Sequence, residues 1–220
     1  MSVQPLVTFI VPSIGRDTLP RALRSIDAQT DRAFLAILVM DGCEAPACAA
    51  DFAWLRVINN PVRTGISNHA GAVRNLAIAE AETDWVAFLD DDDTLSPRYV
   101  EMLAAELVLA AGAPDPPPDA VVFRMMLHGG YVLPPPGAAD FFEGGVGISF
   151  AARRMPVCLG GAEEFRFVPG STEDFKALDA LRRNKAAIMM SCRVAYFVRM
   201  DPADASAFES DGKTYMLFYV

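Results

Sequence analysis

The sequence is short of the residues that build zinc sites and disulfide frameworks. It has four cysteines without paired CxxC spacing, and only two histidines. Small secreted scaffolds and structural zinc modules both depend on a higher density of these ligands. We therefore expect the cysteines to be small buried thiols in a reduced, cytoplasmic chain.

Positive charge and uninterrupted apolar segments are equally scarce. The 19 basic residues stand against 28 acidic ones, which gives a formal net charge of -9. Nucleic-acid-binding proteins usually present basic faces, so this balance argues against nucleic acid as the main partner. The start of the sequence has no basic signal-peptide region, and charged residues such as Glu106 and Arg193 interrupt the long apolar stretches. These patterns predict no targeting segment and no integral membrane segment.

Apolar residues are abundant instead, at 52% of the 220-residue chain, which suffices for one sizeable core. In residues 1–111, apolar runs alternate with segments of helical spacing. The runs predict buried strands at 6–12, 34–40, 54–58 and 84–89, and the spacing predicts helices at 17–29, 71–82 and 96–112. Such alternation is typical of a largely parallel sheet covered by helices on both faces, in which ligands bind beyond the carboxyl ends of the strands.

The proline-rich stretch "GAPDPPPD" at 112–119 cannot continue a helix and predicts an exposed connector. After it the pattern favours strands. The later segments predict a hairpin around His128, Gly129 and Gly130, strands at 145–152 and 187–198, and a helix at 171–184. The apolar residues 214–220 require burial or a partner.

Four aspartates, Asp90 to Asp93, follow the predicted strand at 84–89. Neighbouring like charges about 4 Å apart repel by roughly 1 kcal/mol in water and roughly 4 kcal/mol at an effective dielectric of 20. An EF-hand calcium loop is excluded, because Leu95 stands where that loop needs glycine and a strand precedes the run. Two interpretations stay open. Either one or two of the carboxylates hold a Mg²⁺ or Mn²⁺ ion, or the run is a solvated turn in which Asp93 or Ser96 caps the next helix.

Other polar residues lie at predicted strand ends or helix starts. Asp41 ends the second predicted strand and could accept hydrogen bonds from a base or a ribose, although an aspartate in a turn is the commoner role. Gly71 opens the next helix and brings Arg74 and Asn75 into its first turn, where backbone amides and a guanidinium could bind a diphosphate. An exposed surface arginine is the alternative for Arg74, and His69 could be a loop residue only.

Taken together, these residues resemble the family 2 glycosyltransferases that have the nucleotide-sugar GT-A fold. The segments that carry the resemblance are "VTFIVPSIGRDTLPRALRSIDAQT", "LVMDGCE", "GAVRNLAI", "WVAFLDDDDTLSP", "GISFAARR" and "STEDF". The resemblance implies an α/β fold: a Rossmann-like, mostly parallel sheet flanked by helices, with a smaller strand-rich acceptor-side half. It also implies a single domain, with residues 1–111 as the nucleotide-sugar-binding half and residues 112–220 as the acceptor-binding and C-terminal half.

By the same resemblance, the donor is a nucleotide diphosphate sugar, with a UDP-sugar favoured, and the cofactor is Mn²⁺ or Mg²⁺. The residues that would bind the donor are Pro12, Ser13, Asp41, Arg74, Asp90 and Asp91. Asp92 would bind the metal as part of a DxD motif, and its neighbours Asp91 and Asp93 are the other candidates for this role.

The "STED" stretch resembles the family's acidic motif on the acceptor side, in which an aspartate is the general base. That role falls on Asp174, with Glu173 as the alternative. In an inverting transfer such a carboxylate must take the proton of the acceptor hydroxyl as its oxygen attacks the anomeric carbon. Helix capping by Ser171 or Thr172, with acidic residues at the positive end of the helix, is the competing interpretation.

Two departures from the family bear on function. The first strand ends in "PSIGR" where many members have a Tyr-Asn pair, so the resemblance assigns no nucleotide contact to Ile14 or Arg16. The QxxRW motif of processive synthases is absent from the sequence. We therefore expect an inverting, metal-dependent glycosyltransferase that makes single, non-processive transfers to a hydroxyl acceptor: a glycan, a lipid-linked glycan or a small molecule. A sugar nucleotidyltransferase and a non-catalytic nucleotide-binding module are the alternatives, and the oligomeric state is open.

Overall fold

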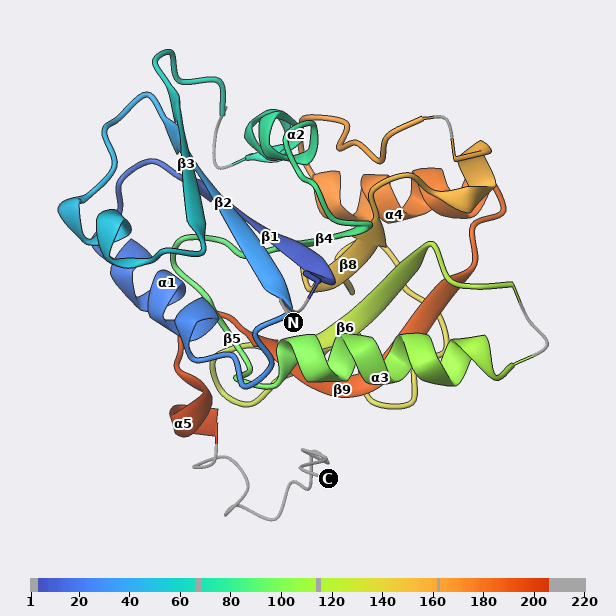
Figure 1. The fold of residues 1–220 in the computed structure, drawn as a ribbon. Helices are drawn as coiled ribbons and strands as arrows, with labels where there is room; N and C mark the ends of the chain where they lie inside the picture. The colour runs from blue at the N-terminus through green and yellow to red at the C-terminus, as the bar shows by residue number, and fades with distance from the viewer. Residues whose placement is uncertain (1–3, 66–68, 114–115, 162, 206–220) are drawn as a thin grey trace.

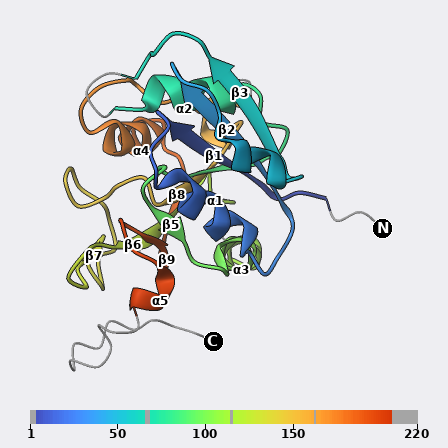
Figure 2. The same ribbon diagram turned by 90° about the vertical axis from the view of Figure 1, so that its left-hand side faces the viewer.

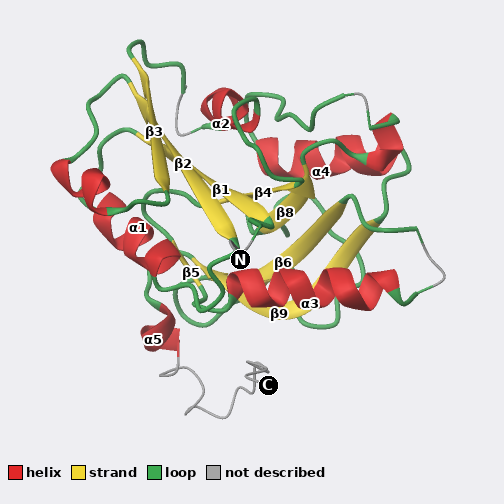
Figure 3. Ribbon diagram, in the orientation of Figure 1, coloured by secondary structure: helices red, strands yellow, loops and turns green. Residues whose placement is uncertain are grey.

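The computed structural model describes residues 4–65, 69–113, 116–161 and 163–205. These residues form a nine-stranded sheet with helices on both faces. Figure 1 shows α2 and α4 on one side of the sheet and α1 and α3 on the other, and Figure 3 shows the same layers coloured by secondary structure. This arrangement confirms the predicted α/β class with flanking helices.

Four parallel strands form the N-terminal half of the sheet, in the order β3-β2-β1-β4. Their bounds are Val7–Ser13 (β1), Phe34–Asp41 (β2), Leu55–Asn60 (β3) and Trp85–Phe88 (β4). Every residue of β1 is buried, because this strand has a neighbour on each side and helices cover both faces of the sheet. The continuous apolar run that predicted the strand follows from this central position.

Helices connect these strands and cover the sheet. They are α1 (Leu19–Asp27), α2 (Gly71–Ile78), α3 (Tyr99–Ala111), α4 (Glu173–Arg183) and α5 (Pro202–Ala205), with short 3-10 helices η1 (Ala47–Asp51) and η2 (Val157–Leu159). Of the described helices, none has the length and apolar character to cross a membrane.

The C-terminal half adds strands to the same sheet. β8 (Phe150–Arg153) pairs antiparallel with β4, and β6 (Ala120–Met126) pairs with β8 and with β9 (Ile188–Phe197). The short strand β5 (Thr94–Leu95), directly after the acidic run, pairs with β9, and β7 (Val132–Leu133) forms the predicted hairpin with β6. The sheet is thus continuous across the two halves, and the boundary between them stays a prediction.

Neither α3 nor α4 has the side-chain cap hydrogen bond that the sequence predicts. α4 begins directly after Thr172, one of its two predicted cap residues, whereas α3 begins later than predicted. The backbone N–H of Ser96 donates to the Ala195 carbonyl at 2.9 Å, which extends the pairing of β5 with β9, and α3 begins only at Tyr99. Thr172 precedes α4 in the left-handed region, with φ of 53°, and its hydroxyl hydrogen-bonds Glu143 instead of the helix. The cap of α4 is absent because the distant Glu143 takes the Thr172 hydroxyl, whereas the Ser96 hydroxyl accepts a hydrogen bond from the backbone N–H of Arg98 at 3.3 Å, in a turn before α3 begins.

The strand predicted at 145–152 is also shorter, since β8 begins at Phe150. The residues before it form a closely packed loop. An added Cβ at Gly145 would lie 2.3 Å from the Phe142 ring, and one at Gly147 would lie 2.2 Å from Met125 Cε. A larger residue at either position would therefore require the Phe142 ring or the Met125 side chain to move.

All four cysteines are free thiols. Three of them are half-buried and one is exposed, so the expectation of buried thiols is wrong, and the cytoplasmic location stays a prediction. The apolar residues 214–220 lie outside the described residues.

Candidate active site

The carboxyl ends of β1, β2 and β4 meet at one edge of the sheet, where parallel sheets bind ligands. A cavity of about 80 Å³ lies at this edge. Its lining includes the six residues predicted to bind the donor, which are Pro12, Ser13, Asp41, Arg74, Asp90 and Asp91. The structure thus brings together residues from three strand ends and one helix. We call this space the smaller cavity.

A second space of about 440 Å³, the larger cavity, adjoins the first. It is lined by Glu173 and Asp174 of α4 and by the glycine-rich loop before β8. His69, Arg74 and Asp90 line both cavities. The predicted donor residues and the predicted base therefore lie on adjacent spaces that share a wall.

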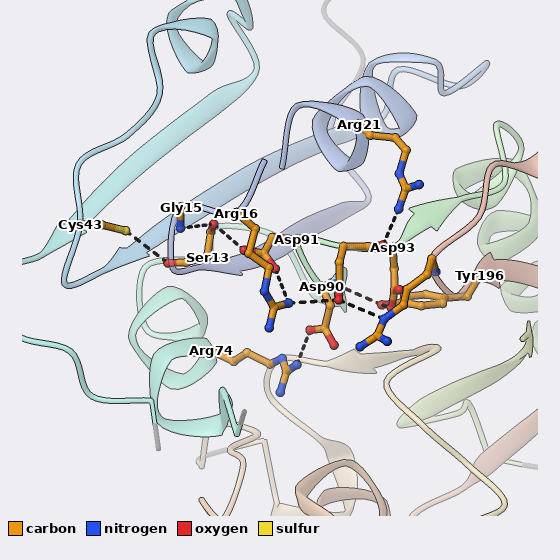
Figure 4. A network of polar contacts seen from close by, with 12 residues as sticks. Ser13, Gly15, Arg16, Arg21, Cys43, Arg74, Asp90, Asp91, Asp93 and Tyr196 are labelled. Carbon is orange, nitrogen blue, oxygen red and sulfur yellow. Dashed lines mark hydrogen bonds and ion pairs between the residues drawn. The ribbon is translucent and has the colours of Figure 1, made fainter. Parts of the chain in front are cut away.

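The first two aspartates of the acidic run pair with residues from the N-terminal half. Asp90 accepts a hydrogen bond from Arg74 at 2.5 Å. Asp91 accepts one from the Ser13 hydroxyl at 2.7 Å and one from Arg16 Nη1 at 2.9 Å. Figure 4 shows Arg16 and Arg74 reaching the run from different elements. Each carboxylate thus has a cationic partner within the chain.

The last two aspartates also pair with the C-terminal half. Asp92 Oδ2 lies 3.2 Å from Arg16 Nη1 and 3.3 Å from Arg199 Nε. Asp93 accepts hydrogen bonds from the Tyr196 hydroxyl at 2.7 Å and from the backbone N–H of Arg199 at 2.9 Å. The loop is therefore held by contacts from β9 and the residues after it.

Burial of the run shows in its pKa values. Burial raises the pKa of Asp91, although the Ser13 hydroxyl and the Arg16 guanidinium act to lower it. Burial and the nearby charge of Asp90 raise the pKa of Asp93 to about 7. Because Asp91 and Asp93 are only 3% and 5% exposed, the solvated-turn interpretation is wrong. The repulsion within the run is offset by arginines and hydrogen-bond donors of the chain itself.

Asp41 is buried at the end of β2 and holds the segment that follows β3. Asn60 and the backbone N–H of Thr64 donate to Oδ1, and the N–H of Gly65 donates to Oδ2, each at 2.8 Å. Burial alone would raise the pKa of Asp41, but these hydrogen bonds keep it below the ordinary value. Asp41 therefore organises a turn and lines the smaller cavity at the same time.

A buried network, the Arg74–Glu173 clasp, joins α2 to α4, which Figures 1 and 2 both show side by side. Glu173 accepts hydrogen bonds from the backbone N–H groups of Ala70 and Gly71, each at 2.9 Å, and from Arg74 Nη1 at 2.5 Å. Burial acts to lower the pKa of Arg74, but Asp90 and Glu173 raise it. Arg74 is only 4% exposed, so the surface-arginine alternative is wrong.

Asp174 follows Glu173 but has a different environment. Its carboxyl group lines the larger cavity, and an added Cβ at Gly147 would lie 3.6 Å from its Oδ2. Burial raises its pKa, against the backbone amides at the start of α4, which lower it. A carboxylate with a raised pKa beside a cavity is suited to accept a proton.

Comparison with known proteins identifies the family. The model of the family described as Glycosyl transferase family 2 matches residues 8–125, more than half of the chain. The chain belongs to glycosyl transferase family 2. An uncharacterized glycosyltransferase of Haemophilus influenzae is 30% identical over 100 residues, which are 44% of this chain and 32% of that protein. The succinoglycan biosynthesis protein ExoO of Rhizobium meliloti is 34% identical over 114 residues, 50% of this chain and 31% of that protein. The chain thus spans about a third of the length of these curated relatives.

Solved structures of glycosyltransferases share the fold of this family 2 chain. TarS of S. aureus, residues 1–349 in complex with UDP-GlcNAc, superposes with a TM-score of 0.66 at 17% identity, covering 92% of this chain and 61% of that one. The mannosyltransferase PcManGT of Pyrobaculum calidifontis, in complex with GDP-Man and Mn²⁺, gives a TM-score of 0.58 at 15% identity, covering 94% and 60%. At these identities the likeness shows the fold alone.

The side chains available as metal ligands at this family 2 site limit how a metal ion could bind. Among the described residues, no group of three or more histidine, cysteine or acidic side chains could hold a metal ion. A divalent ion at the acidic run would therefore take one or two carboxylates and complete its shell with phosphate oxygens and water, as Mg²⁺ commonly does.

Three site residues were not assigned a role from the sequence. Arg16 bridges two aspartates, Tyr196 hydrogen-bonds Asp93, and His69 lines both cavities. Arg16 stands in the "PSIGR" departure from the family pattern, which marks the position as unusual. Tyr196 lies within an apolar strand and carries no local signal.

Gly71→Ala should destabilise the protein by about 1–3 kcal/mol, although alanine is normally the better helix residue by roughly 1 kcal/mol. An added Cβ would lie 2.6 Å from Glu173 Oε2, a carboxylate that the clasp holds in place. Thermal unfolding measures the effect. The control is Gly112→Ala, where the nearest atom would be Leu109 O at 3.6 Å. Equal melting temperatures for the two variants would contradict the close approach at Gly71.

Proposed function

We propose that this chain is an inverting glycosyltransferase that moves one sugar from a nucleotide diphosphate donor to a hydroxyl acceptor in a single, non-processive transfer. The observation that carries the proposal is the wall that the two cavities share, formed by His69, Arg74 and Asp90. A donor sugar at this wall would present its anomeric carbon to an acceptor in the larger cavity, on the side opposite the diphosphate. Attack from that side inverts the configuration.

Donor binding is assigned to the residues that line the smaller cavity, namely Pro12, Ser13, Asp41, Arg74, Asp90 and Asp91. Membership in glycosyl transferase family 2 supports a nucleotide sugar as the donor. Proteins of the same fold have been solved with UDP-GlcNAc or GDP-Man. A UDP-sugar is the donor that we test first.

Mn²⁺ or Mg²⁺ binding is assigned to Asp92. Asp91 lines the smaller cavity and Asp93 the larger one, but both are buried, whereas Asp92, between them in sequence, lines neither cavity, has a side chain that is 20% exposed and pairs with Arg16 at 3.2 Å and Arg199 at 3.3 Å. This difference favours Asp92 among the three candidates. A bound divalent ion would neutralise the charge that builds on the departing diphosphate.

The general base is assigned to Asp174, and the acceptor, a glycan, a lipid-linked glycan or a small molecule, to the larger cavity. Both oxygens of Glu173 already accept hydrogen bonds in the clasp, from Ala70, Gly71 and Arg74. Asp174 instead lines the larger cavity, and burial raises its pKa. The geometry therefore supports Asp174 as the base and Glu173 as a residue that positions Arg74.

A nucleoside diphosphate should raise the melting temperature in a metal-dependent way. A ligand at a hundred times its dissociation constant stabilises by about 2.7 kcal/mol, which corresponds to about 5–10 °C for a domain of this size. Thermal unfolding with UDP, GDP and other nucleoside diphosphates, each with and without Mn²⁺ or Mg²⁺, measures the shift. Asp92→Ala should remove the metal-dependent part, because it removes the assigned ligand.

The matched control is Asp27→Ala, which removes an exposed aspartate paired with Arg32 and should keep the full shift. A shift that Asp92→Ala leaves unchanged would contradict the metal assignment. No shift with any nucleoside diphosphate would contradict the proposed function. Turnover of a nucleoside triphosphate with a sugar phosphate would favour a sugar nucleotidyltransferase instead.

A further inference from the structure

Resting on the proposed function, we propose that Arg16 is a donor-site residue that exchanges its partners. In the described arrangement it neutralises Asp91 and Asp92. When a divalent ion binds Asp92 together with the donor, the guanidinium leaves Asp92 and binds the diphosphate. Arg16 thus makes metal binding and nucleotide binding depend on each other.

The Arg16 guanidinium lies against two carboxylates of the acidic run. Arg16 Nη1 lies 2.9 Å from Asp91 Oδ1 and 3.2 Å from Asp92 Oδ2, so a single nitrogen bridges two carboxylates. Figure 4 shows this side chain lying between Ser13 and the acidic run. A divalent ion on Asp92 would lie a few ångströms from this cation and would repel it. The ion and the guanidinium therefore compete for Asp92.

A nucleotide diphosphate is large for the smaller cavity. The smaller cavity, at about 80 Å³, is well below the roughly 300–1,000 Å³ of typical ligand pockets. For a nucleotide diphosphate to fit, side chains that line this cavity have to move. Both arginines pair with two carboxylates, but the Arg16 side chain is 37% exposed with contacts at 2.9 and 3.2 Å, whereas Arg74 is 5% exposed with contacts at 2.5 Å. Of these two arginines, Arg16 is the more exposed and the less closely held.

The charges around Arg74 and Arg16 also differ once a metal ion is bound. The charge of Arg74 is already balanced by Asp90 and Glu173, which leaves it a weaker partner for a diphosphate. Arg16 becomes available as soon as a metal ion takes over the neutralisation of Asp92. Asp91 then keeps its hydrogen bond from the Ser13 hydroxyl at 2.7 Å, so no buried carboxylate loses all of its partners.

The test compares Arg16→Gln with Arg199→Gln. Arg199 pairs with the same Asp92 oxygen at a similar distance, 3.3 Å, but does not line the smaller cavity. Electron paramagnetic resonance measures the binding of Mn²⁺ alone, and calorimetry measures the binding of UDP and of GDP with saturating Mn²⁺. Unfolding curves establish that each variant is folded, and Arg16→Lys, which keeps the charge, serves if the glutamine variant unfolds.

We expect Arg16→Gln to bind Mn²⁺ alone more tightly and to bind the nucleotide with Mn²⁺ about tenfold more weakly, the effect of losing a charge-assisted hydrogen bond. Arg199→Gln should also bind Mn²⁺ more tightly but should keep the nucleotide affinity of the wild type. Arg16→Lys should show a smaller loss of nucleotide affinity, since a single ammonium replaces the planar guanidinium.

Weaker binding of Mn²⁺ alone to Arg16→Gln, or an unchanged nucleotide affinity, would overturn this inference while the proposed function stands. For Arg16→Lys, affinities equal to those of the wild type in both titrations would do the same. A wild-type protein that binds neither UDP nor GDP with Mn²⁺ would overturn the choice of donor and this inference with it. The wild-type titration therefore separates the two failures.

Discussion

Asp174→Asn should lower kcat by about 10²- to 10⁴-fold, the usual contribution of a general base, while nucleotide affinity stays at the wild-type value. Asparagine keeps the size of the side chain but cannot take the proton of the acceptor hydroxyl. Asp174 lines the larger cavity and not the smaller one, so the donor site is unchanged. Steady-state kinetics with the donor found in the nucleotide screen, together with calorimetric titration of the nucleotide, measure both quantities.

The pH dependence of the wild type adds a second readout for Asp174. Because burial raises its pKa, kcat should fall with decreasing pH at a value above the ordinary range of aspartate. The same raised pKa means that the charged carboxylate costs stability at pH 7, so the neutral asparagine should not lower the melting temperature. Unchanged turnover in Asp174→Asn would contradict this assignment and show that another residue is the general base.

The control for this prediction lies on the same helix. Asp179 pairs with Arg182 and Arg183 and lines neither cavity, so Asp179→Asn makes the same chemical change away from the proposed site. It should keep kcat close to that of the wild type. Equal losses in the two variants would indicate that α4 is disturbed as a whole, which would contradict a specific role for Asp174.

Glu173→Gln should lower the free energy of unfolding by about 3–5 kcal/mol, as expected when one partner of a buried ion pair is removed. Both carboxylate oxygens accept hydrogen bonds, from Ala70 and Arg74 on one side and from Gly71 on the other. An amide NH₂ at either place would face another donor. The melting temperature should fall by about 10 °C, which thermal unfolding measures.

Glu164→Gln is the matched control for the clasp. Glu164 pairs with Arg154 at 3.3 Å and with Arg166 at 3.2 Å, but its partners are partly or largely exposed. Ion pairs of this kind contribute about 0–1 kcal/mol, so this variant should unfold close to the wild type. A similar decrease in the free energy of unfolding in both variants would show that the Arg74–Glu173 clasp stabilises the protein no more than an exposed ion pair does.

The spacing of apolar residues along the chain predicted much of the architecture, because it follows directly from which side chains are buried. The unbroken apolar run of β1 follows from its central place in the sheet, and the hairpin of β6 and β7 follows from the glycines between them. Helix starts were predicted less well. Ser96 and Thr172 have the chemistry of caps, but pairing with β9 continues through the Ser96 backbone and delays α3, and the Thr172 hydroxyl binds Glu143. Local propensity cannot report a competing partner that is distant in sequence.

The sequence by itself determined the α/β class, the four parallel strands and the placement of Ser13, Asp41 and Asp90 at one sheet edge. Parallel strands that alternate with helices put their carboxyl ends together whatever the details of packing. The tertiary structure alone decided how the acidic run is neutralised. Arg16 lies 75 positions from Asp91, and Tyr196 lies 103 positions from Asp93. Such pairings depend on which side chains long-range packing brings within a few ångströms, where charges interact strongly and burial shifts a pKa, and no local pattern encodes that distance.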